Sequence, residues 1–256
     1  MPMQLDIGAI KAESRSLLRT GEVNPFRMTL FYLLITLVLD MINSGVSYMI
    51  DSAGGFTVLS FSFVSILIGL VSLVLNAGYY CYCFGILRRE QMPYESLFDA
   101  FPFAGKVILL SIVEGIFIFL WSMLFVIPGI IAAYRYSFAM LNLCENPELG
   151  VMEALNLSKQ QTNGYKMQLF LLQLSFIGWS LLVLGIFLIY ELLIAALLPD
   201  SFLGIMFGSL LLSVLAAGVG VYLTPYLNLS ICRFYQLATA PQVNEPPHFD
   251  SWNDNF

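Results

Sequence analysis

Three ionisable side chains interrupt long apolar stretches of the chain: Asp40, Glu114 and Arg135. An ionised group near the centre of a bilayer costs at least about 2.5 kcal/mol, so such residues pair with one another or line a path for an ion or solute. At ~1.5 Å of rise per helical residue, Asp40 lies about 18 Å and Arg135 roughly 20 Å from the inner membrane edge. Glu114 lies nearer that edge, at about 12 Å.

The matching depths predict that Asp40 and Arg135 face each other inside a helical bundle. One interpretation is a structural ion pair that fixes the register of two helices. The alternatives are a solute or proton pathway that also uses Glu114, and contact of Arg135 with a lipid headgroup.

Residues typical of catalysis are scarce. The single histidine, His248, lies in a polar, Pro-rich C-terminal segment, and no HExxH, GxSxG, Walker or Gly-rich dinucleotide motif occurs. A hydrolase needs a nucleophile with a nearby base, and the apolar stretches contain no histidine to supply one. We therefore expect a non-enzymatic protein.

Four cysteines could in principle hold zinc or an iron–sulfur cluster, if the ends of their helices converged. However, the side chains of a Cys-x-Cys pair on one helix point about 200° apart, which suits chelation poorly. We expect the thiols to act as small apolar fillers, with no metal, no cofactor and no disulfide. These cysteines are Cys81, Cys83, Cys144 and Cys232.

The composition places these residues in a membrane. Of the 256 residues, 59% are hydrophobic and 11% charged, against roughly 25% charged in a soluble domain. Residues 52–87, 167–190 and 201–232 carry no charge, and each run exceeds the ~20 residues that a helix needs to cross a bilayer. The runs do not alternate as transmembrane strands do. The expected fold class is all-α, a polytopic transmembrane helical bundle.

We expect one membrane domain over residues 1–237 and a disordered cytoplasmic tail over 238–256. The Pro128-Gly129 pair is the expected helix break between the third and fourth spans. About six spans are predicted, at residues 28–50, 57–82, 107–127, 130–144, 167–198 and 202–223.

Basic residues give the orientation, because cytoplasmic loops carry an excess of lysine and arginine. Ten of the eleven basic residues fall on one side of the predicted spans, and Arg135 is the exception. Both termini are therefore expected in the cytoplasm. No signal peptide is expected at the polar N-terminus, and the net charge of −6 argues against nucleic acid binding.

Short amphipathic segments precede the outward spans, at residues 5–20, 93–103 and 147–158. The second and third begin at Pro93 and Pro147, and proline suits the first turn of a helix. Their apolar residues recur at helical spacing, which predicts interfacial helices parallel to the membrane on the cytoplasmic side. Three similar units result, by triplication or by convergent hairpin construction. The apolar positions are Tyr94, Leu97, Phe98 and Phe101 in one segment, and Leu149, Met152 and Leu155 in the other.

Small residues on the sixth span allow a neighbouring helix to approach closely. Packing within the chain explains them most simply, and a homo-oligomer formed through this span is the alternative. Apart from the lipid bilayer, the sequence indicates no particular partner. The residues are Gly204, Gly208, Ser209, Ser213 and Ala217.

Residues 125–179 and the end of the last span carry a set of motifs that resembles a family of bacterial integral membrane proteins, known as a domain of unknown function. The resemblance implies a bacterial plasma membrane protein and no particular activity. The interval from Trp179 to Pro225 is longer than in typical members, which leaves the boundary between spans 5 and 6 open. The motifs are Ile127-Pro128-Gly129-Ile130, Tyr136-Ser137, Asn146-Pro147, Ala154 with Ser158, Gly164 with Lys166, Leu174-Ser175-Phe176-Ile177-Gly178-Trp179, Pro225-Tyr226 and Phe234-Tyr235.

Two functions follow from these observations. The first is a structural or accessory role in the bacterial envelope. The second is a small-solute or ion transporter or channel that uses Asp40, Glu114 and Arg135. The two differ in one feature, because a transporter needs a polar cavity within the membrane, lined by those groups.

Overall fold

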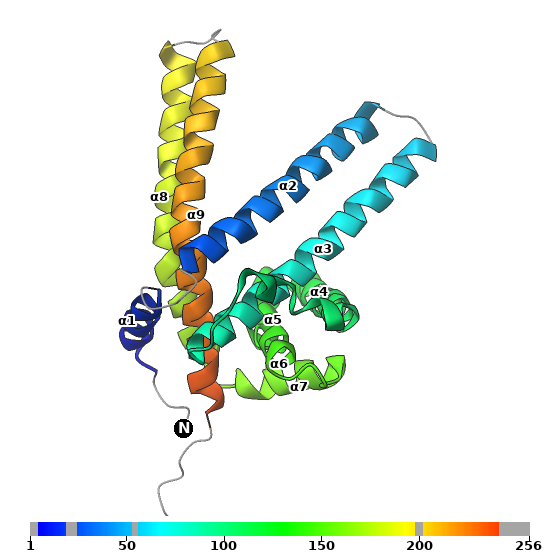
Figure 1. The fold of residues 1–256 in the computed structure, drawn as a ribbon, viewed down its shortest axis with the longest axis vertical. Coiled ribbons are helices and arrows are strands. Elements are labelled where there is room, and N and C mark those ends of the chain that lie inside the picture. The colour runs from blue at the N-terminus through cyan, green and yellow to red at the C-terminus, as the bar shows by residue number, and fades with distance from the viewer. Residues whose placement is uncertain (1–4, 19–24, 53–55, 198–201, 241–256) are drawn as a thin grey trace, which may run out of the picture.

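The computed structural model describes residues 5–18, 25–52, 56–197 and 202–240, and in these residues the fold is all-helical (Figure 1). The elements in chain order are α1 (Ile7–Leu17), α2 (Pro25–Ser52), α3 (Phe56–Leu87), the 3-10 helices η1 (Tyr94–Phe98) and η2 (Phe101–Phe103), α4 (Ala104–Leu124), α5 (Val126–Tyr136), α6 (Ala139–Glu145), α7 (Val151–Gln161), α8 (Lys166–Leu197) and α9 (Phe202–Thr239).

The helices are long and apolar enough to make this a multi-pass membrane protein. Five described segments can cross a bilayer by length and composition: Pro25–Val46, Ser62–Leu87, Tyr94–Leu124, Val126–Glu145 and Lys166–Tyr190. The sixth predicted span is the first part of α9, where the side chains of residues 202–217 lie outside the described part. A count of six therefore stays a prediction. The predicted tail lies outside the description from residue 241 on, and α9 runs through Thr239.

The chain forms helical hairpins. In Figure 1, the α2–α3 pair and the α8–α9 pair diverge from a common lower region, and α4 packs against α5 as a third hairpin. We call residues 74–103, 136–176 and 222–240 the base, and residues 30–52, 56–73, 177–197 and 202–221 the arms. Helix α8 ends at Leu197 and α9 begins at Phe202, and the predicted turn at Pro199-Asp200 lies outside the described residues.

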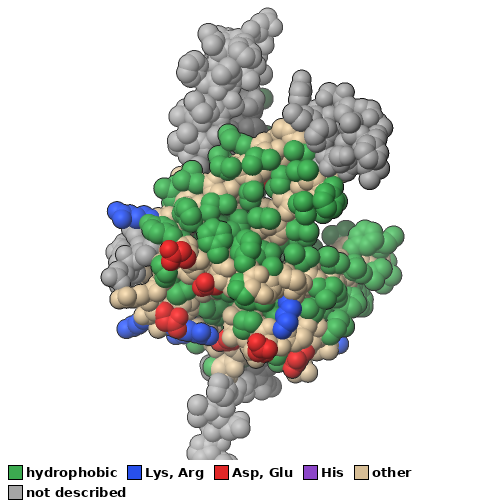
Figure 2. Space-filling model, turned by 45° about the vertical axis from the view of Figure 1, so that its right-hand side comes forward, with side chains coloured by type: hydrophobic (Ala, Val, Ile, Leu, Met, Phe, Trp, Pro, Cys, Tyr) green, Lys and Arg blue, Asp and Glu red, His purple; other side chains and the backbone are tan. Residues whose placement is uncertain are grey.

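The base holds most of the buried side chains. Tyr79 and Tyr82 of α3 pack with Phe138, with Leu141 of α6 and with Phe234 of α9 in one continuous cluster. The arms expose large apolar side chains instead, and in Figure 2 the hydrophobic surface lies above a band that carries the charged groups. A hydrophobic surface is expected where the protein faces lipid, and a charged band is expected where it faces water.

Two predicted boundaries are wrong. The turn between α4 and α5 lies at Phe125, whose backbone is extended, and not at Pro128-Gly129. Pro128 instead sits in the first turn of α5, where its missing N–H is not needed, and Gly129 lets α5 approach Ser122 of α4. The predicted fourth span is two helices, because the chain breaks between Tyr136 and Ala139.

The predicted interfacial segments form helices of different kinds. Residues 93–103 form the 3-10 turns η1 and η2, with Leu97 buried and the aromatic residues exposed. The third segment forms α7 from Val151, four residues after Pro147. The first forms α1, where the Asp6 carboxylate accepts hydrogen bonds from the backbone N–H groups of Gly8 and Ala9. Of the three predicted segments, the first and the third therefore form amphipathic α-helices, α1 and α7.

Close backbone contact explains why residues 93–103 pack as they do. A methyl group added at Gly78 of α3 would overlap the backbone carbonyl of Leu97, so η1 rests directly on the α3 backbone. The chain leaves α3 through Arg89, at φ 60°, and the N–H of Glu90 bonds to the carbonyl of Gly85. This closing turn of α3 directs the chain back along the helix toward Gly78.

Candidate functional site

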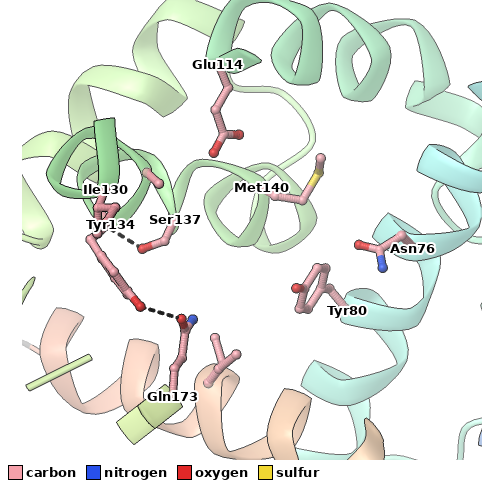
Figure 3. Close-up of a pocket in the computed structure, with 10 residues that line it drawn as sticks. Asn76, Tyr80, Glu114, Ile130, Tyr134, Ser137, Met140 and Gln173 are labelled. Atoms are coloured by element: carbon pink, nitrogen blue, oxygen red, sulfur yellow. Dashed lines mark hydrogen bonds between the residues drawn. The ribbon is translucent and has the colours of Figure 1, made fainter. Parts of the chain in front are cut away.

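A polar pocket lies between six helices at the level where the base meets the arms. Its volume is about 420 Å³, and α6, through Met140, also contributes to its wall, together with α3, α4, α5, α8 and α9. Figure 3 shows Glu114 pointing from α4 into this space, with Tyr134 and Gln173 on one side and Tyr80 and Asn76 on another. The lining residues are Asn76, Tyr80, Glu114, Ile130, Ala133, Tyr134, Ser137, Met140, Gln173 and Ile231.

Hydrogen bonds fix most of the polar groups in the wall. The Tyr134 hydroxyl donates to Gln173 Oε1 at 2.9 Å, which joins α5 to α8. Ser137 Oγ donates to the Tyr134 carbonyl at 2.9 Å, and Asn76 Nδ2 donates to the Tyr32 hydroxyl at 3.4 Å. The wall is therefore built before any ligand enters.

Glu114 differs from these groups. Its side chain is half-buried, and no described residue donates a hydrogen bond to its carboxylate or forms an ion pair with it. It is the one ionisable carboxyl group in the pocket wall. A carboxylate within an apolar helix costs free energy unless something compensates its charge, so Glu114 has the strongest demand for a ligand here.

The other two predicted residues lie elsewhere. Asp40 is exposed on the surface of α2, and Arg135 ends α5 beside a separate hollow of about 170 Å³. The ion pairs that the described residues form are Arg88–Glu145 and Arg233–Glu13, so the predicted Asp40–Arg135 pair is wrong. Depth along the membrane normal is one coordinate only, and α2 and α5 belong to different hairpins (Figure 1).

The backbone of Arg135 has a structural role that the sequence did not suggest. Its carbonyl accepts hydrogen bonds from Ser158 Oγ at 2.9 Å and Thr162 Oγ1 at 3.2 Å. Ser158 Oγ also accepts from the Phe138 N–H at 3.1 Å. Two hydroxyls of α7 thus satisfy the groups freed by the break between α5 and α6. One signal of this contact was present in the sequence, the motif residues Ala154 and Ser158, which lie one helical turn apart. Both are buried in the structure.

The cysteines face opposite sides of α3, as the geometry of a helix requires. Cys83 and Cys232 of α9 are buried in the same apolar cluster, and Cys144 of α6 packs against that cluster. Within the described ranges no three His, Cys, Asp or Glu side chains form a group that could hold a metal ion.

Sequence reasoning missed most of the pocket wall. Asn76 and Gln173 are polar amides inside runs without charge, and that contrast could have singled them out. Tyr134 gave less warning, because tyrosine is common near the ends of membrane helices.

The comparisons agree with the motifs. The family model of a protein of unknown function (DUF975) matches residues 123–241, which run from the end of α4 through α9. No curated protein and no solved structure matches the chain. The matched region contains the break between α5 and α6 and the two α7 hydroxyls that stabilise it. Over residues 123–241 the chain is therefore similar to the DUF975 family of unknown function.

Proposed function

We propose that this protein binds a small organic cation with N–H donors in the pocket beside Glu114, as a non-enzymatic protein of the bacterial plasma membrane. The observation that carries the proposal is the carboxylate of Glu114, which faces a polar pocket and has no partner among the described residues. A purely structural or accessory role would leave such a group in a packed interior, so the solute-handling alternative has the better support.

The chemistry of the wall favours an organic cation over a bare metal ion. Glu114 supplies the negative charge, while Asn76 and Gln173 supply amide oxygens for N–H donors. The rings of Tyr80 and Tyr134 suit a cation through their π faces. Ile130 and Met140 add apolar surface for a short carbon chain.

Charge placement supports an orientation with both termini in the cytoplasm. Most of the charged side chains that Figure 2 shows lie in its lower part, below a largely hydrophobic surface. An excess of basic residues marks the cytoplasmic side. Lys159 is exposed on α7, so a cysteine there should react with an impermeant maleimide only after the membrane is opened. Labelling of this cysteine from outside intact cells would show the opposite orientation.

Binding of ethylammonium to the purified full-length protein in detergent tests the ligand. Equilibrium dialysis should show one saturable site per chain, and Glu114→Gln should lower its affinity by about 10- to 100-fold, because a charge-assisted hydrogen bond contributes about 1.5–3 kcal/mol. Tetramethylammonium, which has no N–H donor, should bind more weakly.

Asp40→Asn is the matched control, since it removes an intramembrane carboxylate that does not line the pocket. Its affinity should equal that of the wild type. Equal binding by the wild type and Glu114→Gln, or no saturable binding by a folded wild type, would contradict the proposed ligand site and favour a structural role.

A further inference from the structure

A second hollow lies outside the Glu114 pocket, where α1 crosses α8 and α9. Its volume is about 260 Å³. It is lined by Lys11 and Arg15 of α1, Ser175, Phe176 and Trp179 of α8, and Tyr226 of α9. Two cations, two hydroxyls and three aromatic rings thus share a space that suits a small anion.

Both cations are held in place by aromatic side chains. The Lys11 ammonium lies 4.4 Å from the centre of the Phe176 ring, and the Arg15 guanidinium lies 5.6 Å from that of Tyr226. Arg15 Nη2 also donates to the Tyr226 hydroxyl at 3.5 Å. Both residues keep N–H groups that can donate hydrogen bonds to a ligand. The reason is that a ring face attracts the positive charge without accepting the N–H groups as an oxygen acceptor does.

No carboxylate neutralises this pair in the described part of the chain. Lys11 and Arg15 lie one turn apart on one face of α1, and like charges at this spacing repel. Burial and the charge of Arg15 lower the pKa of Lys11. Glu13, the only acid within α1, pairs with Arg233 of α9 at 2.8 Å. Asp6 is occupied by the backbone amides at the start of the helix.

The position of the hollow suits the surface of a membrane. Helix α1 buries Ile10 and Leu18 against the protein and lies beside the points where α8 and α9 leave the base. Trp179, in the wall, is half exposed, and tryptophan is enriched at the level of lipid headgroups. Leu5 N–H donates to Gln168 Oε1 at 3.0 Å, which ties the start of α1 to α8.

We infer that Lys11 and Arg15 bind a phosphate group, and that the hollow is a site for the headgroup of an anionic phospholipid or for a soluble phosphate ester of similar size. The two cations supply charge and N–H donors, Ser175 and Tyr226 supply hydroxyls, and the rings supply walls. Arginine and lysine together are the usual partners of phosphate oxygens. Bound phosphate also removes the repulsion between the two cations.

Native mass spectrometry of the full-length protein in detergent, titrated with phosphatidylglycerol, tests this site. The double variant Lys11→Gln/Arg15→Gln should bind the lipid about 10- to 30-fold more weakly, as expected for two cations at an anionic membrane surface. The control Arg89→Gln/Lys159→Gln removes the same charge from exposed positions on α7 and after α3, and should bind as the wild type does.

Two further arms identify the source of the phosphate and guard against misfolding. Phosphatidylcholine should bind weakly, and glycerol 1-phosphate should compete only if the ligand is a soluble ester. The single variants Lys11→Gln and Arg15→Gln should each show part of the loss if the double variant does not fold. Equal phosphatidylglycerol binding by the wild type and the folded Lys11 and Arg15 variants would overturn the site.

Discussion

The base and the arms of this protein are both built from apolar helices but are held together in different ways. In the most apolar stretch of Pro25–Val46, which forms an arm, 6% of the residues are buried, against 44% in Val126–Glu145 near the base. An arm helix needs only an apolar surface toward lipid and an intact backbone ladder. The base needs side chains of particular shape, because its helices pack against one another.

Polar contacts show the same difference. In the arms, Ser72 and Thr36 donate to carbonyls of their own helices. In the base, the Tyr235 hydroxyl donates to Glu145 at 2.6 Å and lies 2.8 Å from the Asn142 amide oxygen, which joins α9 to α6. Contacts between helices fix their relative positions, whereas contacts within a helix do not. The base therefore determines where the hairpins point.

The largest expected difference comes from shortening a leucine in each region. Leu141→Ala should lower the free energy of unfolding by about 2–5 kcal/mol, because Leu141 is 1% exposed in the core of the base. Leu37→Ala, on an arm surface where Leu37 is 49% exposed, should change it by less than about 1 kcal/mol. SDS titration of mixed micelles, followed by tryptophan fluorescence, measures both. Equal losses would mean that the arms are packed as tightly as the base.

A pair of glycines on one helix sharpens the comparison. Gly78→Ala should destabilise the protein by about 1–3 kcal/mol, because the methyl group meets the backbone carbonyl of Leu97, which cannot turn aside as a side chain can. Gly69→Ala, also in α3, meets nothing within 4 Å and should stabilise the helix by up to about 1 kcal/mol. Thermal unfolding in detergent distinguishes the opposite signs. A stabilising Gly78→Ala would show that η1 does not rest on α3.

The smallest expected effect concerns the hydroxyls. Ser158→Ala should destabilise the protein by about 1–2 kcal/mol, because the Phe138 N–H loses its acceptor while Thr162 still bonds the Arg135 carbonyl. Ser72→Ala removes a bond within one arm helix and should cost less than about 0.5 kcal/mol. The same SDS titration applies. If the two substitutions lower the free energy of unfolding equally, the break between α5 and α6 does not depend on α7.

Several features of the fold could be predicted from the sequence because they depend on local properties. Uncharged runs predicted the first residues of α3, α8 and α9 to within about four residues, since crossing a bilayer depends on length and apolarity alone. Breaks were placed less well. No residue at Phe125 indicates a helix break, although the turn lies there. Pro128 does indicate one, but a proline in the first turn of a helix does not break that helix.

The candidate site divides in the same way. Glu114 could be identified from the sequence, because a carboxyl group inside an apolar helix is conspicuous wherever the helix lies. Its surroundings could not, since Tyr134, Gln173 and Asn76 reach the pocket from three different helices. The pairing of Asp40 with Arg135 was wrong for the same reason. Matching depth says nothing of rotation about a helix axis or of the hairpin to which each residue belongs.

By itself, the sequence determined that this is an all-helical, multi-pass membrane protein that resembles a family of unknown function, and the DUF975 match over residues 123–241 supports that resemblance. Only the tertiary structure decided that Glu114 faces a pocket, and that Lys11 and Arg15 share a hollow with α8 and α9. The physical reason is the range of the forces involved. Transfer of a helix into lipid is a sum over its own residues, whereas a binding site depends on which faces of distant helices meet.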